Sequence, residues 1–243
     1  MILLIIGIVL CILLVFLIEK FVPKKFNKFI SLILWILIAF LGYKLYDSVI
    51  GPVKFNEQKE IRYAKVIKNL KDIKAGELAY NEINGKFTKN FDSLVRFIDT
   101  AQFAIVQRRD SSYADVEKNK AYGIDSGYFI DVIVTDTLGF TSVRDSLYDG
   151  TDRYKTMMNV PGTDQQFELN AGSIEKNNVT YSVFEAKVAK DVVLKGMDKD
   201  LILQEKQVVS VDGVNGAYIK VGSMDEINTS GNWPKIYDAK EEK

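Results

Sequence analysis

Two long apolar stretches dominate the start of the chain, ILLIIGIVLCILLVFLI at residues 2–18 and FISLILWILIAFLGY at residues 29–43. The first contains seventeen residues without a charge, near the lower limit for crossing a hydrocarbon core about 30 Å thick at about 1.5 Å per helical residue. The second continues into Leu45, Tyr46, Val49 and Ile50, and Lys44 can reach the membrane interface along its apolar stem. The sequence therefore predicts two transmembrane helices that form a hairpin over residues 1–50.

The loop between these stretches, EKFVPKKFNK at residues 19–28, contains Pro23 as a helix breaker and four lysines close to the helix ends. Because cytoplasmic loops are enriched in Lys and Arg, this loop is expected in the cytoplasm. The large C-terminal part then lies across the membrane, which in a bacterium is the periplasm. We therefore expect a multi-pass protein of the inner membrane with a periplasmic C-terminal domain.

Two other interpretations of the first stretch are less favoured. A cleaved signal peptide would start with a basic segment and end at a small-residue cleavage site, and residues 2–18 show neither. A lipid-attachment signal at Cys11 would need a small residue in place of Leu10. A membrane-spanning helix is therefore the preferred interpretation.

The rest of the chain has the mixed composition of a globular domain. Setting aside the five lysines and one glutamate of residues 1–46 leaves 27 basic and 31 acidic residues from totals of 32 each. This acidic balance does not favour nucleic-acid binding, which depends on basic residues that release counterions. The chain has no histidine and its one cysteine is Cys11, so most hydrolase mechanisms and zinc sites are excluded. We expect a protein that is not an enzyme and has no cofactor.

An amphipathic helix is predicted after Gly51-Pro52. Apolar side chains recur on one face at helical spacing, while most lysines occupy other faces. The candidate partner-binding residues on this face are Ile61, Ala64, Ile67, Leu70 and Ile73. Such a face more often covers a domain's own sheet than a partner helix, and both interpretations are kept.

Asn84-Gly85 is a suitable end for this helix, because glycine accepts the left-handed conformation that terminates many helices. A shorter helix is expected to begin near Asn90, whose side chain can accept hydrogen bonds from the amides that follow it. Its apolar side chains, expected in the core, are Phe91, Leu94, Val95 and Ile98.

The end of the predicted long helix resembles the first helix of type IV pilins and type II secretion pseudopilins. The resemblance rests on AYNEINGKF at residues 79–87 and FDSL at residues 91–94, which follow a transmembrane helix and an amphipathic helix. It implies a helix that leads into a sheet and a role in an envelope assembly. The chain departs from those families in lacking the basic leader and the glycine-phenylalanine processing site.

A wider resemblance, over most of the soluble part, is to membrane-anchored periplasmic proteins of Bacteroidota. It is carried by residues 54–98, by VFEAKV at 183–188 with LKGMD at 194–198, and by residues 220–233. In that phylum, periplasmic proteins are O-glycosylated at Asp followed by Ser or Thr and then a small or aliphatic residue. Five such motifs, which favour the periplasmic topology, begin at Asp47, Asp92, Asp99, Asp136 and Asp145.

The remainder of the chain is predicted to be rich in β-strands. Residues 128–135, YFIDVIVT, form a strong strand by their β-branched and aromatic content. Other short strands, separated by Asn, Asp and Gly turns, are expected at residues 166–169, 180–189, 192–194, 201–203, 207–211 and 217–221. Short, closely spaced strands indicate an antiparallel sheet.

With the helices all at the front, the predicted fold class is α+β. Two transmembrane helices are followed by a long amphipathic helix and a short helix that pack on an antiparallel β-rich domain. The expected segments are a transmembrane hairpin at 1–50, a helical segment at 51–100, a β-rich domain at 101–237 and a polar tail at 238–243.

Carboxylate pairs such as Asp149 with Asp152 and Asp198 with Asp200 could contribute oxygen ligands to a calcium ion. Both pairs lie in turn-like stretches where Asp is expected in any case. No metal ligand or catalytic residue is therefore assigned.

The favoured function is a structural or interaction subunit of a bacterial envelope assembly, such as pilus-like, secretion or gliding machinery. Its expected partners are the lipid bilayer and either other envelope proteins or a second copy of the chain. The alternative is a tethered periplasmic ligand-binding or sensing module, with a cavity lined by Tyr122, Tyr128, Phe129 and Tyr181.

Overall fold

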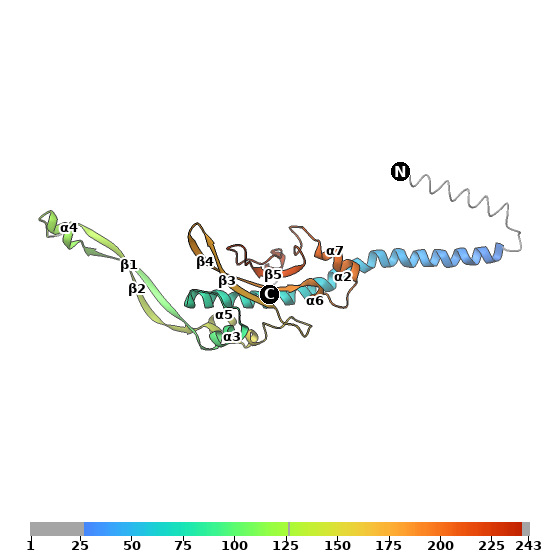
Figure 1. The fold of residues 1–243 in the computed structure, drawn as a ribbon, viewed down its shortest axis with the longest axis horizontal. Coiled ribbons are helices and arrows are strands. Elements are labelled where there is room, and N and C mark those ends of the chain that lie inside the picture. Colours follow the sequence, from blue (N-terminus) through green and yellow to red (C-terminus); the bar gives the residue numbers. More distant parts are fainter. Residues whose placement is uncertain (1–26, 126, 240–243) are drawn as a thin grey trace. The chain divides into compact units, whose positions relative to one another are not determined.

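The structure is a computed structural model that describes residues 27–125 and 127–239 (Figure 1). The chain divides into two compact units between Glu57 and Gln58, and each unit is described by itself. The first predicted membrane helix, at residues 2–18, lies outside the described residues. Within the described part the fold is α+β, with a long N-terminal helix and antiparallel sheets, which confirms the predicted class in this form.

Helix α2 runs without interruption from Asn27 to Asn84 and contains Pro52. The sequence had indicated a new helix after Gly51-Pro52, and this expectation is wrong. Proline removes one helical hydrogen bond, but a helix can absorb that loss by small local adjustments of the backbone. The result is one helix that belongs to both units.

The apolar part of α2 has the character of a membrane span. Its large apolar side chains from Leu32 to Val49 are all exposed, for example Trp35 at 69% and Leu45 at 71%. Among the described residues, α2 is the one helix long and apolar enough to cross a membrane, judged by length and composition. The second predicted span thus lies in the one candidate membrane helix of the described residues, which is compatible with an N-terminal anchor.

The end of α2 and the start of the next helix follow the sequence expectations. Gly85 comes directly after α2 with a φ of +70°, the left-handed conformation expected at a helix end. Helix α3, Phe91–Thr100, begins after Asn90, whose side chain accepts a 2.8 Å hydrogen bond from the amide of Asp92. Leu94 and Ile98 of α3 are fully buried.

We call residues 58–101 and 143–239 of the second unit the body. Its β part is a three-stranded antiparallel sheet with the strand order β3-β4-β5 (Figure 1). Its strands are β3, Glu168–Lys176, β4, Val179–Ala189, and β5, Tyr218–Gly222. Asn177 and Asn178 connect β3 to β4 with φ values of 55° and 61°. A two-residue turn with both residues in the left-handed region matches the twist of a hairpin, and asparagine tolerates it.

Gly222 shows why β5 ends where it does. Its φ is +77°, and a Cβ placed there would come within 2.2 Å of the carbonyl oxygen of Phe184. Only glycine permits this close approach of β5 to β4.

The second sheet is a two-stranded antiparallel hairpin. Strand β1, Gln102–Ala114, pairs with β2, Phe129–Ser142, with a one-residue irregularity between Ile105 and Val106 that leaves Leu138 of β2 unpaired. A short helix, α4, Val116–Ala121, lies in the connection. The strong strand predicted at 128–135 is thus present and longer than expected, whereas β1 was not predicted.

Several short helices replace predicted strands. Helices α6, Lys190–Val193, and α7, Lys199–Lys206, occupy the positions where strands at 192–194 and 201–203 were expected. The side chain of Asp198 accepts hydrogen bonds from the amides of Asp200 and Leu201, and this cap starts α7. Residues 207–211 form no strand. Three predicted strands were therefore wrong.

The remaining helices complete the described chain. They are α5, Val143–Tyr148, the 3-10 turn η2, Arg153–Lys155, and α8, Ile236–Ala239. The predicted polar tail from Asp238 therefore begins inside α8. Tyr148 of α5 is fully buried, and its hydroxyl donates a 2.8 Å hydrogen bond to the carbonyl of Asp72 on α2.

Candidate interaction surface

The predicted partner-binding face on α2 is mostly part of the core. Ile67, Leu70 and Ile73 are 0–1% exposed, Ala64 is half-buried and Ile61 is 55% exposed. A side chain already covered by its own domain cannot contact another protein, so the partner-binding prediction is corrected for Ile67, Leu70 and Ile73. Of this set, Ile61 is the side chain that remains accessible.

A group of buried charges lies beside this face. Lys190 is fully buried, and its Nζ donates to Glu205 Oε1 at 3.1 Å, to the Glu205 carbonyl at 2.6 Å and to the Val214 carbonyl at 2.7 Å. Burial lowers the pKa of Lys190, and Glu205 opposes that shift. Because all three ammonium protons have acceptors, this lysine stabilises the fold and is not available as a nucleophile.

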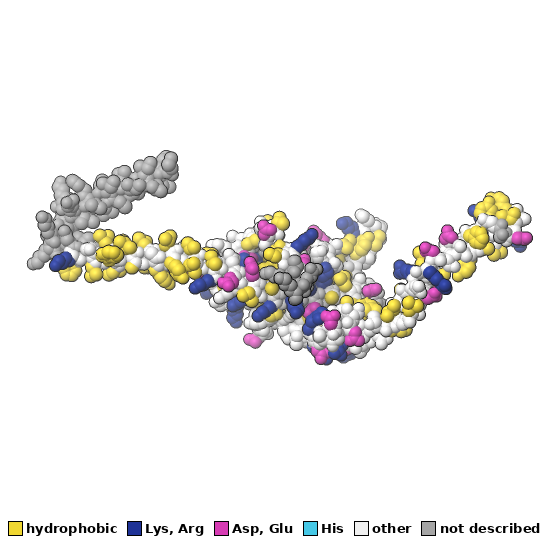
Figure 2. Space-filling view, turned by 180° about the vertical axis from the view of Figure 1, so that it is seen from behind, with side chains coloured by type: hydrophobic (Ala, Val, Ile, Leu, Met, Phe, Trp, Pro, Cys, Tyr) yellow, Lys and Arg dark blue, Asp and Glu magenta, His cyan; other side chains and the backbone are white. Residues whose placement is uncertain are grey.

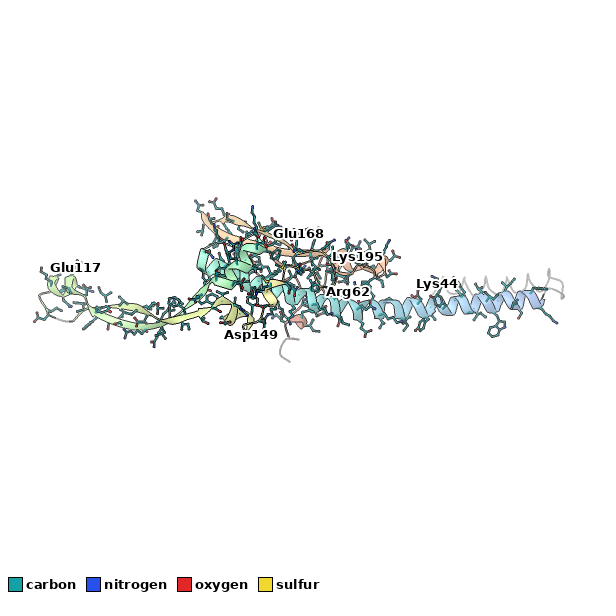
Figure 3. The ribbon with its side chains drawn as sticks, turned by 90° about the horizontal axis from the view of Figure 1, so that it is seen from below. Lys44, Arg62, Glu117, Asp149, Glu168 and Lys195 are labelled. Carbon is teal, nitrogen blue, oxygen red and sulfur yellow. The ribbon has the colours of Figure 1, made fainter. Side chains whose placement is uncertain are left out.

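The carboxylate of Glu205 also connects α7 to α2. Lys59 donates to Glu205 Oε2 at 2.9 Å, and the Tyr63 hydroxyl donates to Oε1 at 3.3 Å. Arg62 donates to the carbonyls of Val193 and Lys195, both at 3.0 Å, and Figure 3 shows Arg62 beside Lys195. These contacts hold the segment around α6 and α7 against the body part of α2.

Glu77 is the second unusual buried acid. It is fully buried on α2, Oε2 accepts a 3.0 Å hydrogen bond from the amide of Thr88, and Oε1 has no hydrogen-bond partner among the described residues. Burial raises the pKa of Glu77 to about 8. The side-chain oxygen of Asn81, one helical turn further on, is also buried without a partner. A proton on Glu77 would give this pair of acceptors a donor.

Three of the four carboxylates predicted as possible calcium ligands have other partners. Asp198 caps α7, while Asp149 pairs with Arg153 at 3.2 Å and Asp152 pairs with Arg144 at 3.3 Å. In the described residues, no group of three or more His, Cys, Asp or Glu side chains could hold a metal ion.

The residues predicted to line a ligand cavity do not come together. Tyr122, Tyr128 and Phe129 lie at the end of the β1–β2 hairpin, and Tyr181 lies on β4 of the other sheet. Tyr122 and Phe129 are 65% and 61% exposed. Large exposed aromatic rings form a surface rather than the lining of an enclosed cavity.

The hairpin arm, defined as residues 102–142, carries the main exposed apolar surface of the second unit. Figure 2 shows hydrophobic side chains gathered at its end and interspersed with charged ones along its length. Both faces of the ribbon contribute to this surface. The large apolar side chains more than 40% exposed are Ile105, Val106, Tyr113, Val116, Tyr122, Ile124, Phe129, Ile130, Ile133, Leu138 and Phe140.

Both outer edges of the arm are also unpaired. The described residues provide β1 and β2 with no third strand, so each strand leaves every second backbone amide and carbonyl facing outward. A thirteen-residue strand is about 40 Å long. Isolated two-stranded ribbons bury little apolar surface and gain stability when another strand joins them.

The end of the arm is locally well organised. Asn119 is 3% exposed, and its amide side chain accepts from the Tyr128 amide at 2.8 Å and donates to the Tyr128 carbonyl at 3.0 Å. The rings of Tyr122 and Tyr128 lie 5.3 Å apart, and Lys118 Nζ lies 4.2 Å from the Tyr128 ring centre. These contacts fasten α4 to the start of β2 and give the end of the arm a defined shape.

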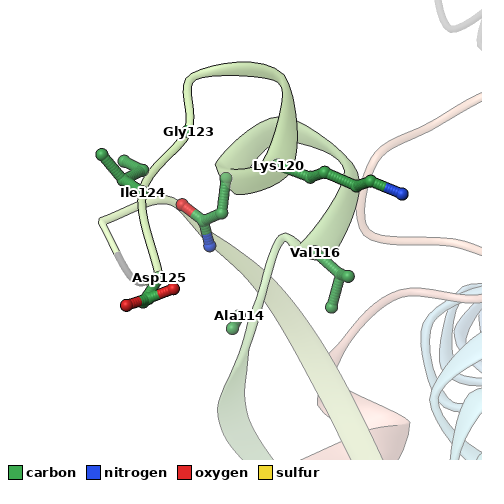
Figure 4. A pocket seen from close by; sticks show the side chains of 7 residues that line it. Ala114, Val116, Lys120, Gly123, Ile124 and Asp125 are labelled. Atoms are coloured by element: carbon green, nitrogen blue, oxygen red, sulfur yellow. The ribbon is translucent and has the colours of Figure 1, made fainter.

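A shallow hollow of about 410 Å³ lies at this end (Figure 4). Its lining includes Val116, Asn119, Lys120, Ile124 and Asp125. Lys120 and Asp125 point in different directions in Figure 4. The hollow is open and its charged groups do not converge, so it fits a side chain from another surface better than an enclosed small ligand.

No pattern in the sequence points directly to this surface. Residues 128–135 were recognised as a strand, but an apolar strand is normally taken to be buried. The partner strand, QRRDSS at residues 107–112, lacks the apolar alternation by which a half-buried strand is recognised. The chain matches no protein-family model, no curated protein and no solved structure.

Proposed function

We propose that this protein is a membrane-anchored, non-enzymatic interaction subunit of a bacterial envelope assembly, and that the hairpin arm is its docking element. Helix α2 anchors the chain through its apolar part, the compact body supports the arm, and the arm engages another protein chain. The anchor belongs to the inner membrane and the body to the periplasm, as the lysine-rich loop at residues 19–28 favours.

The observation that carries this proposal is the exposure of the arm. Soluble monomers rarely expose large contiguous apolar patches, and such patches mark sites of interaction. On the arm, Phe129, Ile133 and Leu138 are 61%, 69% and 65% exposed. The body of the same unit buries its large side chains efficiently, with Tyr63, Tyr148 and Phe184 at 0–1%. An apolar ribbon on a well-packed body favours a binding role for the ribbon.

The edges of the arm define the mode of binding. Natural proteins protect free strand edges with prolines, lysines or covering loops. Neither β1 nor β2 contains proline or lysine, and the described residues cover neither edge with a third strand. Such edges suit strand addition, in which backbone hydrogen bonds give affinity and alternate side chains give specificity.

Site-specific photo-cross-linking in native membranes tests the proposal. A photoreactive residue at Ile133 should capture a defined envelope protein or a second copy, identified by mass spectrometry of the adduct. The matched control is Val209, an apolar side chain that is 91% exposed but lies outside the arm. Equal capture at Val209, or no adduct at Ile133 and Phe129, would contradict the assignment of the arm as the docking element.

A further inference from the structure

Strand β1 has a charge pattern that is complementary to itself. Its central residues are Arg108, Arg109 and Asp110, and all three are exposed. Arg108 lies opposite Thr135 on β2, and Asp110 lies opposite Ile133. Neither faces a charged cross-strand neighbour within the arm, whereas Arg109 pairs with Asp136 of the same arm at 3.2 Å.

Two-fold symmetry restricts how two copies of β1 can pair. In an antiparallel pair, the symmetry axis runs perpendicular to the sheet, so each residue keeps its face in both copies. Residues directly opposite one another point to the same face. The two-fold axis must therefore lie midway between one residue and the same residue of the other copy. Registers centred between two consecutive residues are excluded.

Among the allowed registers, only one places opposite charges of β1 directly opposite each other. Centring on Asp110 would place two carboxylates opposite each other, and centring on Arg108 would place Asp110 opposite Val106. Centring on Arg109 places Arg108 of each copy opposite Asp110 of the other, which gives two cross-strand ion pairs. Asp136 on each copy balances the facing Arg109 side chains. Like charges directly opposite are unfavourable and opposite charges favourable.

The same register pairs the apolar side chains of β1. It places Ile105 of each copy opposite Tyr113 of the other, and these residues are 48% and 59% exposed in the single chain. Pairs of a β-branched and an aromatic residue are among the more favourable cross-strand neighbours. Strand β2 offers no comparable arrangement, because it contains Asp131 and Asp136 but no basic residue.

We infer that two copies of this chain associate through the outer edges of β1, antiparallel and centred on Arg109, to form a four-stranded sheet in the order β2-β1-β1-β2. This inference rests on the proposed function, because it names a second copy as the partner of the docking element. The outer edges of β2 remain free in this arrangement.

Cysteine cross-linking of the full chain in native membranes tests the register. In a Cys11→Ser background, Arg109→Cys places the two thiols directly opposite, where Cβ atoms of paired strands lie about 4.5–5.5 Å apart. Mild oxidation or a short bifunctional thiol reagent should then give a covalent dimer on a non-reducing gel. Ser112→Cys is the matched control on β1, because its two copies would be about 20 Å apart in this register.

Val134→Cys reports on the other edge. Val134 lies opposite Arg109 within the hairpin, on the same face, and would cross-link if β2 edges met instead in a register centred on Val134. A dimer with Arg109→Cys and none with Ser112→Cys or Val134→Cys supports the inference. A dimer with Val134→Cys, or none at any of the three positions, would overturn it.

Charge reversal gives a second measurement that leaves the fold intact, since both side chains are exposed. Arg108→Asp or Asp110→Arg alone should reduce the yield of the Arg109→Cys dimer about tenfold, because two opposite-charge pairs become like-charge pairs. The double change Arg108→Asp with Asp110→Arg recreates both pairs and should restore the yield. Failure of the double variant to recover would count against the register.

The two proposals fail differently. If photoreactive Ile133 captures another envelope protein while no cysteine dimer forms, the arm remains a docking element and self-association is excluded. If neither experiment gives a product, both proposals are wrong.

Discussion

Strands β2 and β4 have similar β-branched and aromatic content but opposite environments. In β4, Val183, Phe184, Ala186 and Val188 are 0–5% exposed, because the rest of the second unit covers both sides of the sheet at these residues. In β2, Phe129 and Ile133 remain more than 60% exposed. Strand propensity thus specifies an extended conformation, whereas the layer packed against the strand decides whether its apolar side chains stabilise the fold or remain available for binding.

A matched pair of phenylalanines gives the largest expected contrast. Phe184→Ala should lower the free energy of unfolding by about 3–5 kcal/mol, because it leaves a cavity in the core. Phe129→Ala should change it by less than about 0.5 kcal/mol, since the ring is exposed. Chemical denaturation of the full chain in detergent micelles measures both. Similar losses for the two variants would show that the arm packs on the body.

A buried lysine and an exposed lysine test the same contrast for charged side chains. Lys190→Ala should cost about 3 kcal/mol, because it leaves Glu205 partly uncompensated and removes the lysine donor from the carbonyls of Glu205 and Val214. Lys59 still pairs with Glu205, which keeps the cost at the lower end of the usual range. Lys118→Ala on the arm should cost less than about 1 kcal/mol, since it removes an exposed contact with Tyr128. The same denaturation series tests both. A change close to zero in the free energy of unfolding of Lys190→Ala would show that the buried contacts of Lys190 do not stabilise the fold.

A pair of acids extends the comparison to pH. The pKa of Glu77 is raised by burial to about 8 in the folded chain, above its ordinary value near 4.5 in the unfolded chain. The folded state therefore binds more protons between these values, and stability falls as the pH rises. From pH 6 to pH 8 this loss should be about 2 kcal/mol.

The amide variant isolates that effect. Glu77→Gln should remove the pH-dependent loss, because a neutral amide has no proton to release. Asp131→Asn, on the exposed arm, should leave the pH dependence unchanged. Denaturation midpoints of the three proteins at pH 6, 7 and 8 provide the measurement. A slope in Glu77→Gln equal to that of the parent chain would assign the pH dependence to another group.

Local signals in the sequence predicted much of the body. The end of α2 at Gly85, the cap at Asn90, the Asn177-Asn178 turn and strands β4 and β5 all follow from short-range backbone preferences. Residues 192–194 and 201–203 were assigned to the wrong class. Short apolar runs are ambiguous between strand and helix, and the cap at Asp198 decides in favour of α7.

The candidate site was harder to predict, because exposure depends on contacts between distant parts of the chain. The apolar residues from Ile61 to Ile73 have helical periodicity whether they face a partner or their own sheet. In the structure most of them are buried in their own domain. Strand β1 carries charges on both faces because neither face is covered. A pattern based on one buried face cannot detect such a strand.

The unpaired residue Leu138 affects the direction of the arm without changing the side chains that the arm exposes for binding. A bulge bends its strand and increases the local twist without changing the cross-strand pairs on either side. Loss of this single residue would straighten the ribbon and redirect its end, while Arg108, Arg109 and Asp110 kept their neighbours. Homologous chains could therefore adjust the direction of the arm through one-residue insertions or deletions and conserve its binding chemistry.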